Sequence, residues 1–253
     1  MRPEPGVEIV QVAEPTPGPG QVKIRLEAAS VCGTDLHIYS WDAWAAGRIQ
    51  PPRIIGHEFC GTIVDVGEGV TDRKVGDFVS SESHIVCGHC RQCLHGQGHV
   101  CVNTQILGVD VDGGFAEYAV IPWDSARPTD RSVPVEIAAF QDALGNAVHT
   151  AMAGPLKDQV VLITGMGPIG LFAVSVCKAA GAAKVIATEV SPYRIELAHQ
   201  VGADVVLNPM DGPLAPRIMA EAPGGVDATL EMSGHPTSLP LAVECTRPGG
   251  RVS

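Results

Sequence analysis

The sequence predicts an α/β protein of two domains: a β-rich domain over residues 1–152, then a doubly wound parallel sheet over residues 153–253. Three observations predict this fold class. Short segments of the first half alternate apolar and polar side chains between turn residues. In the second half, apolar strands alternate with helical segments, and a G-x-G-x-x-G sequence directly follows the first of these strands.

The strands of the first half lie between glycine, proline and aspartate residues. Residues 22–28 alternate apolar and polar side chains, as do residues 61–66 and, less cleanly, 78–80. Residues 134–152 are rich in alanine and have a helical pattern. Because strands alternate with helices after this segment, whereas short strands predominate before it, we place the domain boundary near Met152.

The second half has a regular strand–helix rhythm. Residues 160–164, 184–189, 205–208 and 226–232 predict strands, and residues 169–180 and 192–201 predict helices. Such a rhythm implies a parallel sheet with helical crossovers. Residues 249–253 look like the beginning of a further strand, and a sheet that stops there would have an exposed edge. We therefore expect a C-terminally truncated chain.

Composition favours small-molecule chemistry. The 253 residues include 17 basic and 28 acidic side chains, a net charge of −11 without a basic run, so nucleic acids and anionic membranes are poor partners. Residues 160–177 carry no charge, but the glycines and Pro168 within them favour a strand, a turn and a buried helix over a membrane span. No leader-like segment is recognisable, so we expect a reducing, cytoplasmic location.

Four cysteines have the spacing of a metal site. Cys87, Cys90, Cys93 and Cys101 form a C-x2-C-x2-C-x7-C pattern. Four thiolates close the coordination shell of a tetrahedral zinc, which makes such a site structural. The alternative is reactive or disulfide-bonded cysteine, but a reducing compartment and regular spacing favour zinc.

The glycine-rich sequence predicts a dinucleotide site. Gly165, Gly167 and Gly170 frame Pro168 and Ile169 directly after an apolar strand and at the start of a helix. In such a motif the first glycine makes the turn, the second lets the backbone approach the pyrophosphate, and the third lets the helix pack on the strand. The positive end of the helix then favours the phosphate charge.

Glu189 ends the next predicted strand, where a carboxylate accepts hydrogen bonds from the adenosine ribose. It would repel a 2′-phosphate, which favours NAD over NADP. Arg194 complicates this prediction, because an arginine there can bind a 2′-phosphate.

A second metal site is indicated by two short motifs. Cys32 begins C-G-T-D-L-H, and His57 and Glu58 belong to a G-H-E triplet. Each is weak alone, but together with the four-cysteine segment and the glycine motif they resemble the zinc-containing medium-chain dehydrogenases, in order and over essentially the whole chain. This resemblance implies a GroES-like catalytic domain over residues 1–152 and an NAD-binding Rossmann domain over residues 153–253. It also implies two zinc ions per chain and, as in many family members, a tetramer.

The resemblance implies that Cys32 and His57 bind a catalytic zinc, with Asp142 in the segment where family members supply a third ligand. Glu58 is the other candidate carboxylate, and the sequence does not decide between the two. Asp142 could instead cap a helix that begins near Gly145.

The resemblance further assigns Thr34 and His37 to a relay that carries the alcohol proton to water. A hydroxyl beside the metal and an imidazole that titrates near neutral pH suit this task. The alternative makes Thr34 a turn residue and His37 a surface histidine.

Within the family, several segments are most similar to the threonine-dehydrogenase subgroup. They are residues 32–44, 84–90, 113–118, 145–151 and 231–234. This similarity implies oxidation of the 3-hydroxyl of L-threonine to 2-amino-3-oxobutanoate with NAD⁺, and places His84 where it helps to select the substrate. The alternatives are a polyol or butanediol dehydrogenase of the same family and an inactive, zinc-stabilised fragment.

Overall fold

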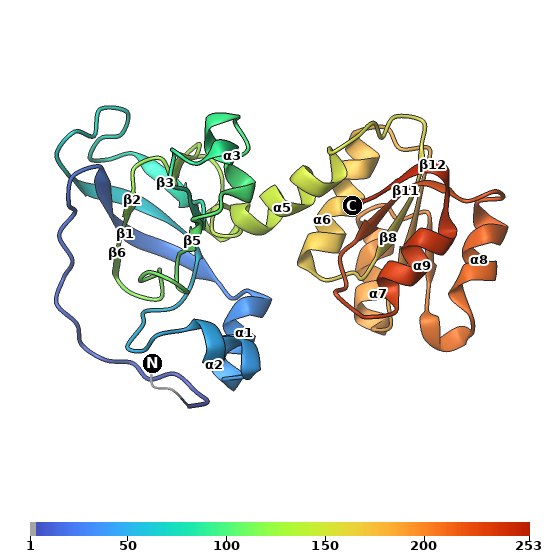
Figure 1. Ribbon diagram of the computed structural model, residues 1–253, viewed down its shortest axis with the longest axis horizontal. Helices are drawn as coiled ribbons and strands as arrows, with labels where there is room; N and C mark the ends of the chain where they lie inside the picture. The colour runs from blue at the N-terminus through green and yellow to red at the C-terminus, as the bar shows by residue number, and fades with distance from the viewer. Residues whose placement is uncertain (1–3) are drawn as a thin grey trace. The chain divides into compact units, whose positions relative to one another are not determined.

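The computed structural model describes residues 4–253, which divide into two compact units, one ending at Asp142 and the other beginning at Ala143 (Figure 1). Helix α5 (Gln141–Ala151) includes this division and ends one residue before Met152, where the sequence predicts the domain boundary. Each unit has its own sheet and its own apolar core.

The first unit is built on a five-stranded antiparallel sheet in the order β6-β1-β2-β3-β7. Its strands are β1 (Gln21–Ser30), β2 (Glu58–Val66), β3 (Phe78–Ser81), β6 (Tyr118–Pro122) and β7 (Ala126–Pro128). The three strand segments predicted in this half lie within β1, β2 and β3. In β1, Val22 and Ile24 are fully buried and pack with Phe59 of β2, whereas Arg25 is exposed. The alternation of apolar and polar residues in β1 therefore reflects which of its side chains face the core.

Short elements complete this unit. Helices α1 (Gly33–Ser40) and α2 (Ala43–Arg48) follow β1, and β4 (His84–Ile85) pairs with β5 (Gln105–Ile106). Between β4 and β5 lie α3 (Arg91–Leu94) and a 3₁₀ turn, η1 (Gly98–Val100). The helix predicted over residues 134–152 is divided in two, α4 (Val135–Ala138) and α5, with a turn at Ala139 and Phe140.

The second unit is a five-stranded parallel sheet in the order β10-β9-β8-β11-β12. Its strands are β8 (Val160–Thr164), β9 (Lys184–Thr188), β10 (Val205–Leu207), β11 (Val226–Glu231) and β12 (Thr246–Val252). Four match the predicted strands to within one or two residues. Residues 249–252 of the final segment, predicted only as the start of a strand, belong to β12, which pairs with β11.

Helices cover both faces of this sheet, so the predicted fold class is confirmed. On one face, Val161 and Ile163 of β8 pack with α5, α6 (Pro168–Ala179) and α7 (Pro192–Gln200). On the other face, Leu162 packs with α8 (Leu214–Glu221) and α9 (Ser238–Cys245), and a 3₁₀ turn, η2 (Pro209–Asp211), precedes α8. Burial on both faces explains why the sequence of β8 is continuously apolar instead of alternating.

None of the helices in residues 4–253 has the length and apolar character needed to cross a membrane. The uncharged run at residues 160–177 is divided between β8, the glycine turn and α6.

Candidate active site

The pairing of β1 with β2 brings the predicted metal ligands together. Ser30 at the end of β1 lies opposite Glu58 at the start of β2, and its hydroxyl donates a hydrogen bond to the Glu58 carboxylate. Cys32 follows two residues later, and His57 immediately precedes β2. One ligand atom each from Cys32, His57 and Glu58 lies within 4.8 Å of the other two. The structure thus brings together a thiol, an imidazole and a carboxylate, all of which are zinc ligands.

Asp35 joins this group, although the sequence analysis did not single it out. Its Oδ2 accepts a hydrogen bond of 2.9 Å from the backbone N–H of Cys32, which closes the first turn of α1. Its Oδ1 lies 3.9 Å from Nδ1 of His57, and both atoms are buried with no hydrogen-bond partner among residues 4–253. A carboxylate beside one ring nitrogen is the usual means of orienting a metal-binding histidine. No spacing rule pairs Asp35 with His57, which lies 22 positions later, although Asp35 lies three residues after the candidate ligand Cys32.

The electrostatics of this group fit a bound cation. Burial raises the pKa of the Asp35 carboxyl, which shows how unfavourable its charge is without a positive neighbour. Burial lowers the pKa of His57, but its hydrogen bond with Cys32 and the charge of Asp35 outweigh that effect, and the net shift is upward. Within the described residues, no lysine or arginine forms an ion pair with Asp35 or Glu58. A divalent ion would offset the cost of burying these carboxylates.

Asp142 lies in a neighbouring cluster. It is the second residue of α5, so the alternative prediction that it precedes and caps a helix is wrong. Its Oδ1 accepts hydrogen bonds from Ser83, one of 2.9 Å from Oγ and one of 3.3 Å from the backbone N–H. The ligand atoms that lie within 4.8 Å of one another around it come from Glu82 and His84, not from Cys32. Its negative charge still acts on His57, whose pKa it helps to raise.

The two residues predicted for the proton relay have different surroundings. Oγ1 of Thr34 lies 3.9 Å from Sγ of Cys32, so the hydroxyl is next to the metal ligands. His37 is exposed on α1, and its Nδ1 lies 2.6 Å from a carboxylate oxygen of Asp42. The rings of His37 and Trp44 also form an edge-to-face pair, with centroids 6.2 Å apart.

The four predicted thiolate ligands converge between β4 and β5. The Sγ–Sγ distances are 3.4 Å between Cys90 and Cys93, 3.8 Å between Cys90 and Cys101, and 3.5 Å between Cys101 and Cys87. A zinc–sulfur bond of about 2.3 Å places tetrahedral sulfurs roughly 3.8 Å apart, so these distances fit one zinc. They do not fit disulfides, whose sulfurs are separated by about 2 Å.

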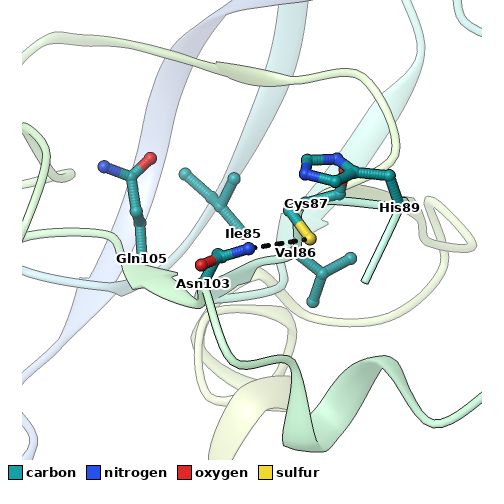
Figure 2. Close-up of a pocket in the computed structure, with 6 residues that line it drawn as sticks. All are labelled: Ile85, Val86, Cys87, His89, Asn103 and Gln105. Atoms are coloured by element: carbon teal, nitrogen blue, oxygen red, sulfur yellow. Dashed lines mark hydrogen bonds between the residues drawn. The ribbon is translucent and has the colours of Figure 1, made fainter. Parts of the chain in front are cut away.

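Asn103 is a further residue that sequence reasoning missed. Its backbone N–H lies 3.3 Å from Sγ of Cys101, and its side-chain amide lies 3.5 Å from Sγ of Cys87. The bond from the Asn103 side chain and a backbone N–H at His89 lower the pKa of Cys87 to about 5, which favours the thiolate that binds metal. Figure 2 shows this contact. Both residues help to line an open cavity of about 440 Å³, together with Ile85, Val86, His89 and Gln105.

The glycine motif joins β8 to α6 as predicted. Gly165 has a φ of 83°, and a β-carbon there would lie 2.8 Å from Ser233. At Gly167 nothing lies within 4 Å of the β-carbon position, so this backbone is open to a ligand. Pro168 is the first residue of α6, and Ile169 packs against the core. The loop sits at the carboxyl end of β8, where the strand order reverses between β9 and β11, the usual position of a nucleotide in such sheets.

Two carboxylates hold the loops at this end of the sheet. Glu189 accepts hydrogen bonds from the backbone N–H groups of Met166, Val190 and Ser191. Burial raises the pKa of Glu189, but the three hydrogen bonds together lower it by a larger amount, and the charge of Arg194 adds to their effect. The net shift of the pKa is downward. Glu231, which the sequence analysis mentioned only within a motif, accepts a hydrogen bond of 3.1 Å from Thr164 and one from the backbone of Ser233.

Comparison with known proteins agrees with this architecture. Residues 18–131 match the alcohol dehydrogenase GroES-like domain family, and residues 168–253 match the zinc-binding dehydrogenase family. The chain is 52% identical over all 253 residues to an L-threonine 3-dehydrogenase of Pyrococcus abyssi and covers 73% of that protein.

Two solved dehydrogenase structures also superpose on this chain. An alcohol dehydrogenase of Escherichia coli in complex with NADH superposes with a TM-score of 0.90 at 35% identity, over 98% of this chain and 73% of that chain. A 2R,3R-butanediol dehydrogenase of Bacillus subtilis superposes with a TM-score of 0.87 at 30% identity, over 100% of this chain and 74% of that chain.

Proposed function

The chain belongs to the zinc-binding alcohol dehydrogenase family, and from this membership we propose that it oxidises L-threonine at its 3-hydroxyl. The products are 2-amino-3-oxobutanoate and NADH. The observation that carries this proposal is the 52% identity to an L-threonine 3-dehydrogenase over all 253 residues of the chain.

In this proposal, Cys32, His57 and Glu58 hold the catalytic zinc, and Asp142 is the alternative carboxylate ligand. A zinc ion supplies a Lewis acid that lowers the pKa of the substrate alcohol. Asp35 orients the ring of His57, and Ser30 orients the carboxylate of Glu58. Thr34, next to Cys32, takes the proton of the alcohol, and His37 passes it to water.

The four-cysteine site holds the second, structural zinc in this proposal. Cys87, Cys90, Cys93 and Cys101 bind it as thiolates, and Asn103 stabilises two of the sulfurs by N–H donation. Because four thiolates leave no open position, this zinc takes no part in the reaction.

The residues that we propose to bind the cofactor lie at the reversal point of the parallel sheet. Gly165, Gly167 and Gly170, with Pro168 and Ile169, present the start of α6 to the pyrophosphate. The remaining lone pairs of the Glu189 carboxylate accept hydrogen bonds from the adenosine ribose, and Arg194 lies beside them. A carboxylate at this position favours NAD over NADP.

The test is steady-state NADH formation with L-threonine, sorbitol and (2R,3R)-2,3-butanediol as substrates. We expect the highest kcat/KM with L-threonine and NAD⁺, and a much lower value with NADP⁺. A higher kcat/KM with butanediol would replace this proposal by the diol-oxidising alternative, which the similarity to the Bacillus subtilis enzyme favours. A protein that binds one zinc and no NADH would be the inactive alternative. A tetrameric state stays a prediction from the resemblance, and a cytoplasmic location stays a prediction from the sequence.

A further inference from the structure

Residues 82–84 form a hydrogen-bonded network with Asp142. Oε1 of Glu82 accepts two hydrogen bonds from His84, one of 3.1 Å from the backbone N–H and one of 3.0 Å from ring Nδ1. Oγ of Ser83 lies 3.2 Å from the same Nδ1 and 2.9 Å from Oδ1 of Asp142. All polar contacts of the His84 ring in this network are therefore on its Nδ1 side.

The network determines which ring nitrogen of His84 carries the proton. An ionised carboxylate accepts hydrogen bonds but donates none, so the hydroxyl of Ser83 gives its single proton to Asp142. Towards the ring, Ser83 can then only accept, and the ionised Glu82 carboxylate can also only accept. Nδ1 must be the donor in both contacts. In the neutral ring this leaves Nε2 with a lone pair that can accept a hydrogen bond from a ligand.

The charge around the imidazole ring of His84 suits a cationic ligand. One ligand atom each from Glu82, His84 and Asp142 lies within 4.8 Å of the other two, so two carboxylates flank the imidazole. Opposing charges are present as well: Arg127 lowers the pKa of Glu82, and His57 opposes the upward pKa shift that Glu82 causes in His84. The side chains of His84 and Glu82 are 38% and 35% exposed, so a small ligand can reach them.

We propose that Glu82 is a positioning residue that fixes His84 in its Nδ1–H form, so that Nε2 accepts a hydrogen bond from the α-ammonium group of an amino-alcohol substrate. This inference rests on the proposed function for the identity of the substrate. The position of the proton on His84 follows from the network alone. A site of this kind distinguishes L-threonine from neutral diols by charge, since a diol brings no ammonium group.

The first test reads the protonation of His84 directly. Long-range ¹H–¹⁵N spectra of the zinc-loaded protein distinguish Nδ1–H from Nε2–H, and the signals that disappear in His84→Asn assign the ring. We expect Nδ1–H in the wild type and in Glu82→Gln, whose amide oxygen still accepts. Glu82→Ala should increase the Nε2–H population relative to Nδ1–H about tenfold, because it removes a hydrogen bond to a charged group. Nε2–H in the wild type, or no change in Glu82→Ala, would overturn the inference.

The second test compares ligands with and without an ammonium group. In Glu82→Ala we expect KM for L-threonine to rise about tenfold while kcat changes less than about threefold, since a binding contact is lost. The inhibition constant of 3-hydroxybutanoate, which lacks the ammonium group, should change less than about twofold. Glu68→Ala, an exposed glutamate outside the network, is the matched control.

Equal weakening of both ligands in Glu82→Ala would mean a general structural role and would contradict the ammonium assignment. If the wild-type protein oxidises no L-threonine, the ammonium assignment fails together with the proposed function. The nitrogen spectra still decide whether Glu82 fixes the tautomer, so the two failures are distinguishable.

Discussion

The carbonyl oxygen of Gly165 lies 2.0 Å from the position that a β-carbon on Gly170 would occupy. The two glycines therefore hold α6 against the end of β8 with no room for a side chain. Gly167, two residues after Gly165, has an extended backbone with a φ of −66°, and nothing lies within 4 Å of its β-carbon position. The same short loop thus contains one glycine required for packing and one whose space is left for a ligand.

Replacing these two glycines by alanine should separate stability from cofactor binding. Gly170→Ala forces a contact far below the van der Waals distance and should reduce the free energy of unfolding by about 1–3 kcal/mol. Gly167→Ala should change it by less than about 0.5 kcal/mol, yet raise the Kd for NADH about tenfold or more, because the methyl group meets the pyrophosphate. Urea unfolding and NADH fluorescence titration measure the two effects. Equal losses of stability in both variants would contradict this division of roles.

Asp35→Asn should weaken zinc binding at the catalytic site. Loss of the carboxylate beside Nδ1 leaves the His57 ring less well oriented, and such changes typically lower metal affinity by about 10–100-fold. Competition with a chromogenic chelator measures the affinity, and exposed Asp124→Asn is the matched control. Unchanged zinc affinity in Asp35→Asn would show that the proximity of Oδ1 of Asp35 to Nδ1 of His57, 3.9 Å apart, has no role in metal binding.

Cys32→Ser and Cys101→Ser should each remove a different zinc ion. Elemental analysis should give one zinc per chain for both variants against two for the wild type. Cys32→Ser should reduce kcat by more than about a thousandfold with little change in Tm, since the electrophile is lost. Cys101→Ser should lower Tm by roughly 10 °C, because a structural zinc contributes to folding directly. Two zinc ions in Cys32→Ser would remove the basis for the catalytic site.

The stability contributed by Glu189 should depend on pH. Its pKa is below the ordinary value in the folded protein because three backbone N–H bonds outweigh the effect of burial. A group with a lowered folded-state pKa stabilises the fold fully above its unfolded pKa, about 4.5, and loses this effect as pH falls through the folded value. Without NAD, Glu189→Gln should therefore be less stable than wild type by about 1–2 kcal/mol at pH 7. The difference should narrow below about pH 4.5, and a difference that grows in acid would contradict this explanation.

Strands with a complete local signal could be predicted from the sequence, whereas helices α8 and α9 of the second unit could not. Residues 160–164 are continuously apolar and end at a glycine, which gives β8 its correct bounds. Helices α8 and α9 have only eight residues each, with Pro216 and Pro240 near their starts. Proline usually marks the end of a helix in a sequence, yet in the first turn its missing N–H would have no partner anyway. Their formation depends on packing against the sheet, which no local pattern records.

The candidate metal ligands could also be grouped from local sequence signals, whereas the residues that contact them could not. Cys32, His57 and Glu58 belong to short motifs that can be recognised directly. The contact between Ser83 and Asp142 joins residues 59 positions apart, and no spacing rule connects them. The grouping of Asp142 with Glu82 and His84 depends on where α5 begins, which sequence patterns locate only to within a few residues.

The segment from Val86 to Thr104 connects β4 and β5, two paired strands of two residues each. Within the described residues it has no apolar core of its own. Its shape is set by four sulfur atoms and by turns at Gly88 and Gly96, both with a φ of 73°. The outward side chains of this segment, Leu94 and Val102 among them, contribute little to its form. Substitutions among these exposed side chains are therefore compatible with the fold of the segment, provided that the four cysteines and the two glycines are kept.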